Sequence, residues 1–165
     1  MSNSWIAEWS TLLSVEAGAA ATLMGLVFVA LSINLNRILT VPHLPGRAVE
    51  SIMQFLQVFL ISTVGLIPRQ SERAFSIEVL VIVAASWGVQ AAVQIRYLMS
   101  RNGQPWSWFV SRAVFTQFAT IPFGVAGIAL LLGVPGAIDW LVPGFVFSFV
   151  AGVVGAWILL VEILR

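Results

Sequence analysis

The sequence contains no cysteine and no lysine, and His43 is its single histidine. Without cysteine the chain can form no disulfide, thiol redox centre, iron–sulfur cluster or thiolate zinc site. One histidine is too few for a haem held by two histidines. We therefore expect no bound metal and no cofactor.

Charged residues are also scarce. They make up 9% of the chain, against about 25% in an ordinary globular domain. Hydrophobic residues make up 59%. So few charges cannot cover a water-soluble surface, and lipid must therefore cover much of the outside. The net charge of +1 gives no bulk attraction to nucleic acid, which we exclude as a partner.

A membrane-spanning helix needs roughly 20 mostly apolar residues, and five windows of the sequence qualify. None alternates with a period of two, so we expect helices rather than β-strands. Pro68 and the sequence GVPG at Gly133–Gly136 mark two of the breaks between the windows. The prediction is one all-α transmembrane bundle over residues 1–165, with spans at about residues 11–35, 48–67, 75–97, 109–132 and 140–164.

The arginines divide unequally between the two sides that five spans define. Two of them, Arg69 and Arg73, fall on one side, and the other six fall opposite: Arg37, Arg47, Arg96, Arg101, Arg112 and Arg165. The positive-inside rule then places the N-terminus outside and the C-terminus in the cytoplasm. A four-span alternative would put both termini on one side and remove this asymmetry. Met1–Ser10 lacks a basic residue, so we expect the first span to be retained and not cleaved as a signal peptide.

Small residues recur along one face of the first span and one face of the fifth. They are Gly18, Gly25 and Ser32, spaced by seven, and Gly144, Ser148 and Gly152, spaced by four. Small residues let the backbones of membrane helices approach closely. Two interpretations are open: packing inside one protomer, or an interface between subunits. In either case, spans one and five are candidates for tight contact with each other or with a neighbouring chain.

The second span carries polar residues on one helix face. Glu50, Gln54 and Gln57 recur at intervals of three and four, and Gln57 lies roughly 16 Å along the helix from Gly46, near mid-membrane. An amide that faced lipid at that depth would lack hydrogen-bond partners, so this face should point into the bundle or a wet cavity. Other spans place polar residues at matching depths: Gln90, Gln94, Arg112, Thr116 and Gln117.

Together these residues predict a polar region that narrows from the cytoplasmic face toward mid-membrane and closes outward with apolar packing. Three interpretations of it are open. The side chains form a hydrogen-bond network that only holds the bundle together, with each bond worth about 0.6 kcal/mol. Alternatively, they line a path for a ligand or an ion, or they bind a partner protein.

Acidic residues at the cytoplasmic ends of the spans need compensation for their charge. We expect Glu50 and Glu162 to pair with Arg112 or Arg96, which lie at similar depth, or to extend toward the membrane surface. Either arrangement removes most of the cost of placing a carboxylate in the membrane.

Glu16 is a separate case, because it lies about one turn inside the first span with no arginine near it in sequence. It is a candidate ion or proton site. The alternatives are that it extends to the outer interface, or that it contacts the loop at residues 69–73.

Four segments sample the chain from its first span to its last: EAGAAATLMGLVFVALSINLNRIL (Glu16–Leu39), HLPGRAVE (His43–Glu50), LIPRQ (Leu66–Gln70) and FVAGVVGAWILLVEILR (Phe149–Arg165). They resemble a family of small multi-span bacterial membrane proteins, whose members are sometimes labelled modulators of a membrane-bound AAA protease. The resemblance implies a location in the bacterial inner membrane and a membrane protein partner. It assigns no functional residue.

Sequence motifs of common enzymes are missing: we find no Walker loop, dinucleotide fingerprint, paired histidines or Ser/His/Asp set. We therefore expect no catalysis. The leading interpretation is a small homo-oligomeric channel or transporter with a polar cavity open to the cytoplasm. A non-catalytic modulator or scaffold of another membrane complex is the alternative. The third is a membrane enzyme acting on lipid or a glutathione-like thiol, because Arg47 and Glu50 open the second span as arginine and glutamate do in small glutathione-using membrane enzymes.

Overall fold

The computed structural model describes residues 4–41, 44–99 and 106–164, where every regular element is helical. The elements are α1 (Ser4–Ile33), α2 (Leu35–Thr40), α3 (Leu44–Gly65), α4 (Glu72–Met99), α5 (Trp106–Leu131), η1 (Ala137–Trp140) and α6 (Leu141–Leu164). Five of them, α1, α3, α4, α5 and α6, are long and apolar enough to cross a membrane. The all-α prediction is therefore confirmed, and the five windows correspond to these helices. The end of the first window is corrected from residue 35 to Ile33, because the helix is interrupted at Asn34 and α2 follows as a separate short helix.

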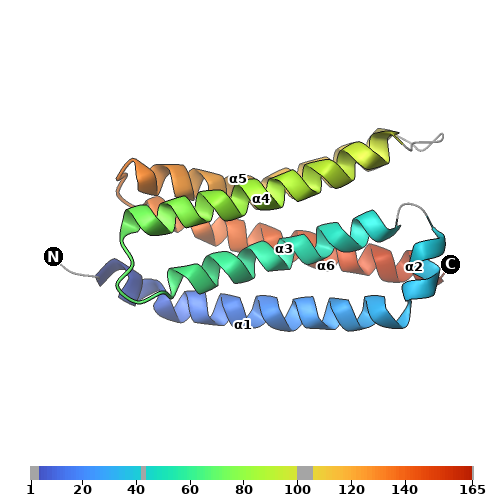
Figure 1. The fold of residues 1–165 in the computed structure, drawn as a ribbon, viewed down its shortest axis with the longest axis horizontal. Helices are drawn as coiled ribbons and strands as arrows, with labels where there is room; N and C mark the ends of the chain where they lie inside the picture. Colours follow the sequence, from blue (N-terminus) through green and yellow to red (C-terminus); the bar gives the residue numbers. More distant parts are fainter. Residues whose placement is uncertain (1–3, 42–43, 100–105, 165) are drawn as a thin grey trace.

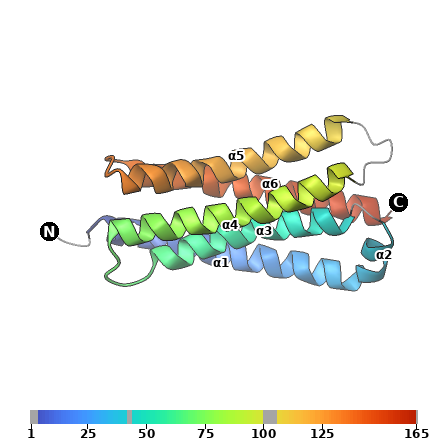
Figure 2. The same ribbon diagram turned by 45° about the horizontal axis from the view of Figure 1, so that its top comes forward.

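Four of the long helices form a ring, and the fifth lies outside it. Around the ring, α3 packs on α4, α4 on α5, α5 on α6, and α6 on α3. The first helix, α1, packs along α3 (Figures 1 and 2). In the most apolar stretch of α3, half of the residues are buried, whereas in the corresponding stretch of α1 only 11% are buried. Helix α3 is therefore central and α1 peripheral. The two chain ends lie at opposite ends of the bundle (Figure 1).

The predicted break at Gly133–Gly136 has a specific backbone cause. Gly133 adopts a left-handed φ of 69°, its N–H donates to the Leu130 carbonyl, and the Val134 N–H donates to the Ala129 carbonyl. This is the hydrogen-bond pattern of a Schellman cap, which needs glycine or asparagine at the left-handed position. It ends α5 and turns the chain back into α6.

The two halves of the ring differ in what fills them. The half near the α3–α4 loop and η1, here called the apolar half, is packed with the fully buried rings of Phe75, Phe123 and Phe145. Phe123 and Phe145 meet edge to face with ring centres 5.3 Å apart. The other half, here called the polar half, contains α3 from Leu44 to Gln57 and the segments of α4, α5 and α6 beside it. Its buried side chains include four glutamines and several hydroxyls.

The glycine stripe on α6 packs inside the protomer. A Cβ atom at Gly144 would lie 2.5 Å from the Phe123 ring, and one at Gly152 would lie 2.5 Å from the Phe55 ring. Ser148, between these two glycines, is fully buried. The small residues on α6 therefore make room for aromatic rings from α5 and α3, as expected where membrane helices pack closely.

The stripe on α1 does not pack inside the protomer. An added Cβ at Gly18 or at Gly25 would meet nothing within 4 Å among the described residues, and Ser32 is exposed. The face of α1 that packs on α3 is the one with buried Leu13 and Ala20. Gly18 and Gly25 therefore do not serve packing within the protomer, and α1 packs mainly on α3, with only a small contact to the fifth span, α6.

Candidate functional site

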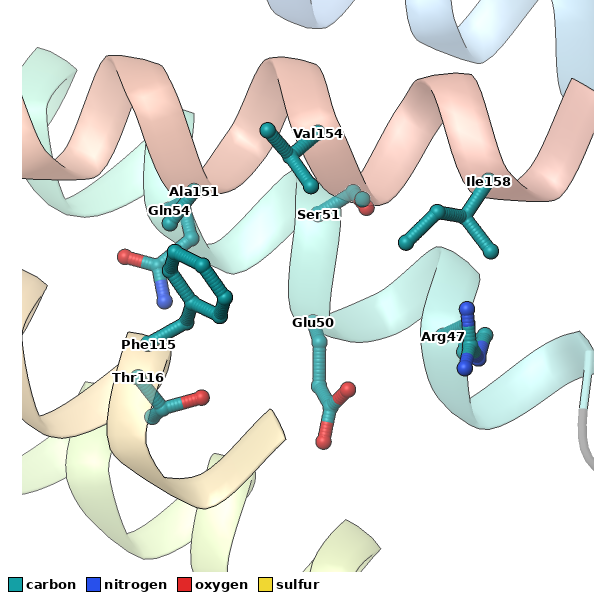
Figure 3. Close-up of a pocket in the computed structure, with 10 residues that line it drawn as sticks. Arg47, Glu50, Ser51, Gln54, Phe115, Thr116, Ala151, Val154 and Ile158 are labelled. Atoms are coloured by element: carbon teal, nitrogen blue, oxygen red, sulfur yellow. The ribbon is translucent and has the colours of Figure 1, made fainter. Parts of the chain in front are cut away.

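A cavity of about 110 Å³ lies in the polar half between α3, α5 and α6. We call it the axial cavity, and it is lined by Arg47, Glu50, Ser51, Gln54, Phe115, Thr116, Ala151, Val154, Gly155 and Ile158. Gln54, Phe115 and Thr116 lie together at its inner end, and Arg47 and Ile158 lie at its outer end (Figure 3). Between them, Glu50 extends away from α6 (Figure 3).

The inner end of the axial cavity meets a chain of buried amides that crosses the ring. Gln57 donates from Nε2 to Ser148 Oγ on α6 at 2.9 Å and to Gln54 Oε1 at 2.8 Å. Gln54 donates in turn to Gln90 Oε1 on α4 at 2.8 Å. Gln54 is 3% exposed and Gln57 is 0% exposed, so both amides face protein and not lipid. This amide chain ties α3 to α4 and α6 near the middle of the bundle.

A second pocket, of about 130 Å³, lies between α4 and α5. Gln90, Gln94, Thr116 and Gln117 supply its polar surface, together with apolar Trp87, Ala91, Ile95 and Leu98. Gln94 Nε2 donates to Thr116 Oγ1 at 3.3 Å. Thr116 lines both spaces, and the hydrogen-bonded pair Gln54 and Gln90 has one member in each.

The predicted polar residues that the structure describes thus line two spaces, whereas the sequence analysis expected one narrowing polar region. Glu50, Gln54 and Thr116 line the axial cavity, and Gln90, Gln94, Thr116 and Gln117 line the α4–α5 pocket. Gln57 lies deeper, inside the amide chain. The side chain of Arg112 lies outside the described residues.

The outer end of the axial cavity carries an ion pair between helices. Arg47 Nη1 on α3 lies 3.8 Å from Glu162 Oε1 on α6, with the two side chains 11% and 19% exposed. The prediction for Glu162 was pairing with Arg112 or Arg96, or extension toward the membrane surface; the contact with Arg47 was not predicted. The pair closes the polar half where α3 begins and α6 ends, because these two helices are neighbours in the ring.

Glu16 lies far from this site. It is half-buried on α1, at the edge of the face that Leu13 and Ala20 bury against α3. Within the described part of the chain, no group of three or more His, Asp or Glu residues is placed to hold a metal ion.

Ser51 is a site residue that the sequence analysis missed. It is 2% exposed and lines the axial cavity, and a Cβ atom at Gly155 would lie 2.4 Å from its Oγ. The signal was present, because Ser51 falls between Arg47 and Gln54 at helical spacing and so shares their face.

Comparison of the chain with protein-family models, curated proteins and solved structures gave no match. The functional argument therefore depends on the geometry of the site.

Proposed function

We propose that the protein is a small homo-oligomeric channel or transporter of the bacterial inner membrane, whose axial cavity receives a small polar solute from the cytoplasm. The observation that carries this proposal is the position of the cavity. Both signs of charge, two hydroxyls and an amide line a space between the spanning helices. Burying such groups is costly unless they are hydrogen-bonded or hydrated. Their position around an open volume therefore favours a binding site over a hydrogen-bond network that only holds the bundle together.

The contrast between the two halves favours a site that opens on one side. The axial cavity ends at the buried amide chain. Beyond it lie the closely packed rings of Phe123 and Phe145. A transporter in a state closed to the far side, or a closed channel, has this arrangement. Passage would require the apolar half to open.

The cytoplasmic placement of the cavity rests on charge. Arg37, Arg47 and Arg96 belong to the polar end of the bundle, whereas Arg69 and Arg73 belong to the α3–α4 loop and the start of α4 at the other end. The positive-inside rule then assigns the polar end to the cytoplasm. We place the second copy of the chain on α1, whose Gly18 and Gly25 leave the helix backbone open to close approach.

Flux across liposomes tests the proposal. Purified protein should pass a class of small polar solutes or ions, and Gln54→Leu, which removes the amide at the inner end of the cavity, should lower the rate. Ala151→Leu should do the same, because Ala151 lines the cavity and a larger side chain fills it. Absence of flux under every solute and voltage gradient would contradict the proposal.

Two control variants introduce a leucine away from the cavity. Gln70→Leu alters a glutamine at the opposite end of the bundle, and Val153→Leu enlarges a side chain on α6 that is 49% exposed. Both should keep the wild-type rate. Equal losses in cavity and control variants would indicate damage to the fold rather than to a path.

A further inference from the structure

The Ala119 carbonyl fixes which groups donate and which accept along the amide chain. Ser148 Oγ lies 3.4 Å from the Ala119 oxygen, and a carbonyl can only accept, so the hydroxyl donates there. Ser148 must then accept from Gln57, which turns the Gln57 NH₂ group toward both Ser148 and Gln54. Gln57 uses its NH₂ group for both bonds, and its Oε1 has no partner among the described residues. Gln54 then accepts from Gln57 at Oε1 and donates from Nε2 to Gln90.

The series ends at Gln90 with a donor that is not used. Gln90 Oε1 accepts from Gln54, and Gln90 Nε2 has no hydrogen-bond partner among the described residues. Gln90 is 1% exposed and lines the α4–α5 pocket. An unpaired buried amide costs about 1–3 kcal/mol, so an acceptor in the pocket would recover a free energy of that size.

The lining of the α4–α5 pocket restricts the chemistry of that acceptor. None of the eight described residues that line it is charged, unlike those of the axial cavity, so this described lining offers no charge to compensate an ionic ligand. Its rim is apolar and faces outward, with Trp87 51% exposed and Ile95 55% exposed. From Trp87 to Leu98 the pocket follows about 17 Å of α4 at 1.5 Å per residue, which suits a molecule with a tail parallel to the helix.

We infer that the α4–α5 pocket binds a neutral, membrane-soluble molecule that presents a carbonyl oxygen to the Gln90 amide, as a quinone with an apolar tail does. The oxygen accepts the free N–H groups of Gln90, and the tail lies against Trp87, Ile95 and Leu98. This site is distinct from the axial cavity and does not depend on transport.

The test is a titration of the reconstituted full chain with decylubiquinone, followed by the NMR signals of the side-chain NH₂ group of Gln90. The signals are assigned by their loss in Gln90→Leu. They should shift saturably with decylubiquinone and stay unmoved with decylbenzene, which has a similar tail but no acceptor. No shift, or an equal shift with decylbenzene, would overturn the proposal. It would indicate that the Gln90 N–H groups already donate to water or to a lipid carbonyl.

A second variant tests the pocket without disturbing the amide chain. Ala91→Leu fills the pocket and should weaken decylubiquinone binding by about tenfold, or 1.4 kcal/mol. Ala92→Leu makes the same change at the adjacent exposed residue, outside the pocket, and should bind as the wild type does. Equal affinity in the wild type and Ala91→Leu would place the ligand elsewhere and contradict the assignment.

Discussion

The two halves of the helical ring share the same four helices but are stabilised in different ways. In the apolar half, buried rings from α4, α5 and α6 fill the interior, and Gly144 admits the Phe123 ring. In the polar half, amides and an ion pair join the helices around two open spaces. The comparison shows that one end of the bundle is closely packed with aromatic rings, whereas the other end contains cavities lined by polar side chains. The mutations below perturb one half at a time, starting with the largest expected effect.

The largest effect should come from overpacking the apolar half. The leucine of Gly144→Leu would overlap the Phe123 ring, because a Cβ atom at this position already lies 2.5 Å from it. Phe123 is fully buried and packs against Phe145. Because neither ring has free space to move into, we expect a loss of about 3 kcal/mol in the free energy of unfolding. Steric-trapping or denaturant unfolding in detergent micelles measures it.

The matched control is Gly25→Leu on α1, where an added Cβ meets nothing within 4 Å among the described residues. Its unfolding free energy should stay within about 0.5 kcal/mol of the wild type, while the proposed oligomer should weaken. A comparable loss of protomer stability in both variants would show that the two stripes do not differ as described.

A smaller effect should follow from cutting the amide chain in the polar half. Gln57→Leu removes two hydrogen bonds, each worth about 0.6 kcal/mol in membrane proteins, so the expected loss is about 1–2 kcal/mol. The double variant Gln57→Leu with Ser148→Ala should lose less than the sum of the two single losses, because both single variants remove the same Gln57–Ser148 hydrogen bond. Fully additive losses would argue against the observed contact between Gln57 and Ser148.

The sequence predicted the helices better than it predicted their neighbours. Length and composition locate five apolar stretches, and the spacing of Gln54 and Gln57 identifies a face that lipid should not touch. Spacing alone does not say which helix receives that face. The order of the ring, the Gln54–Gln90 hydrogen bond and the division into two spaces depend on contacts between residues tens of positions apart.

The glycine stripes show the same limit. Gly18 and Gly144 belong to patterns that look alike in sequence, yet one faces outward and the other receives an aromatic ring. A stripe of small residues indicates that another helix can approach closely. It does not predict which helix approaches, because the approaching side chain lies elsewhere in the sequence. The contact of Glu162 with Arg47 was not predicted for a related reason: the sequence indicates the depth of a side chain in the bundle but not which helix lies beside it.

Accessibility to a thiol reagent tests the difference between the halves most directly, because the native chain has no cysteine to mask. Ser51 and Ser62 are both buried serines of α3, at 2% and 0% exposure; Ser51 lines the axial cavity, and Ser62 lies in the apolar half. A membrane-impermeant methanethiosulfonate should modify Ser51→Cys from the cytoplasmic side of membrane vesicles only, and should leave Ser62→Cys unmodified from either side. Failure to modify Ser51→Cys, or equal modification of both variants, would contradict a hydrated cavity confined to the polar half.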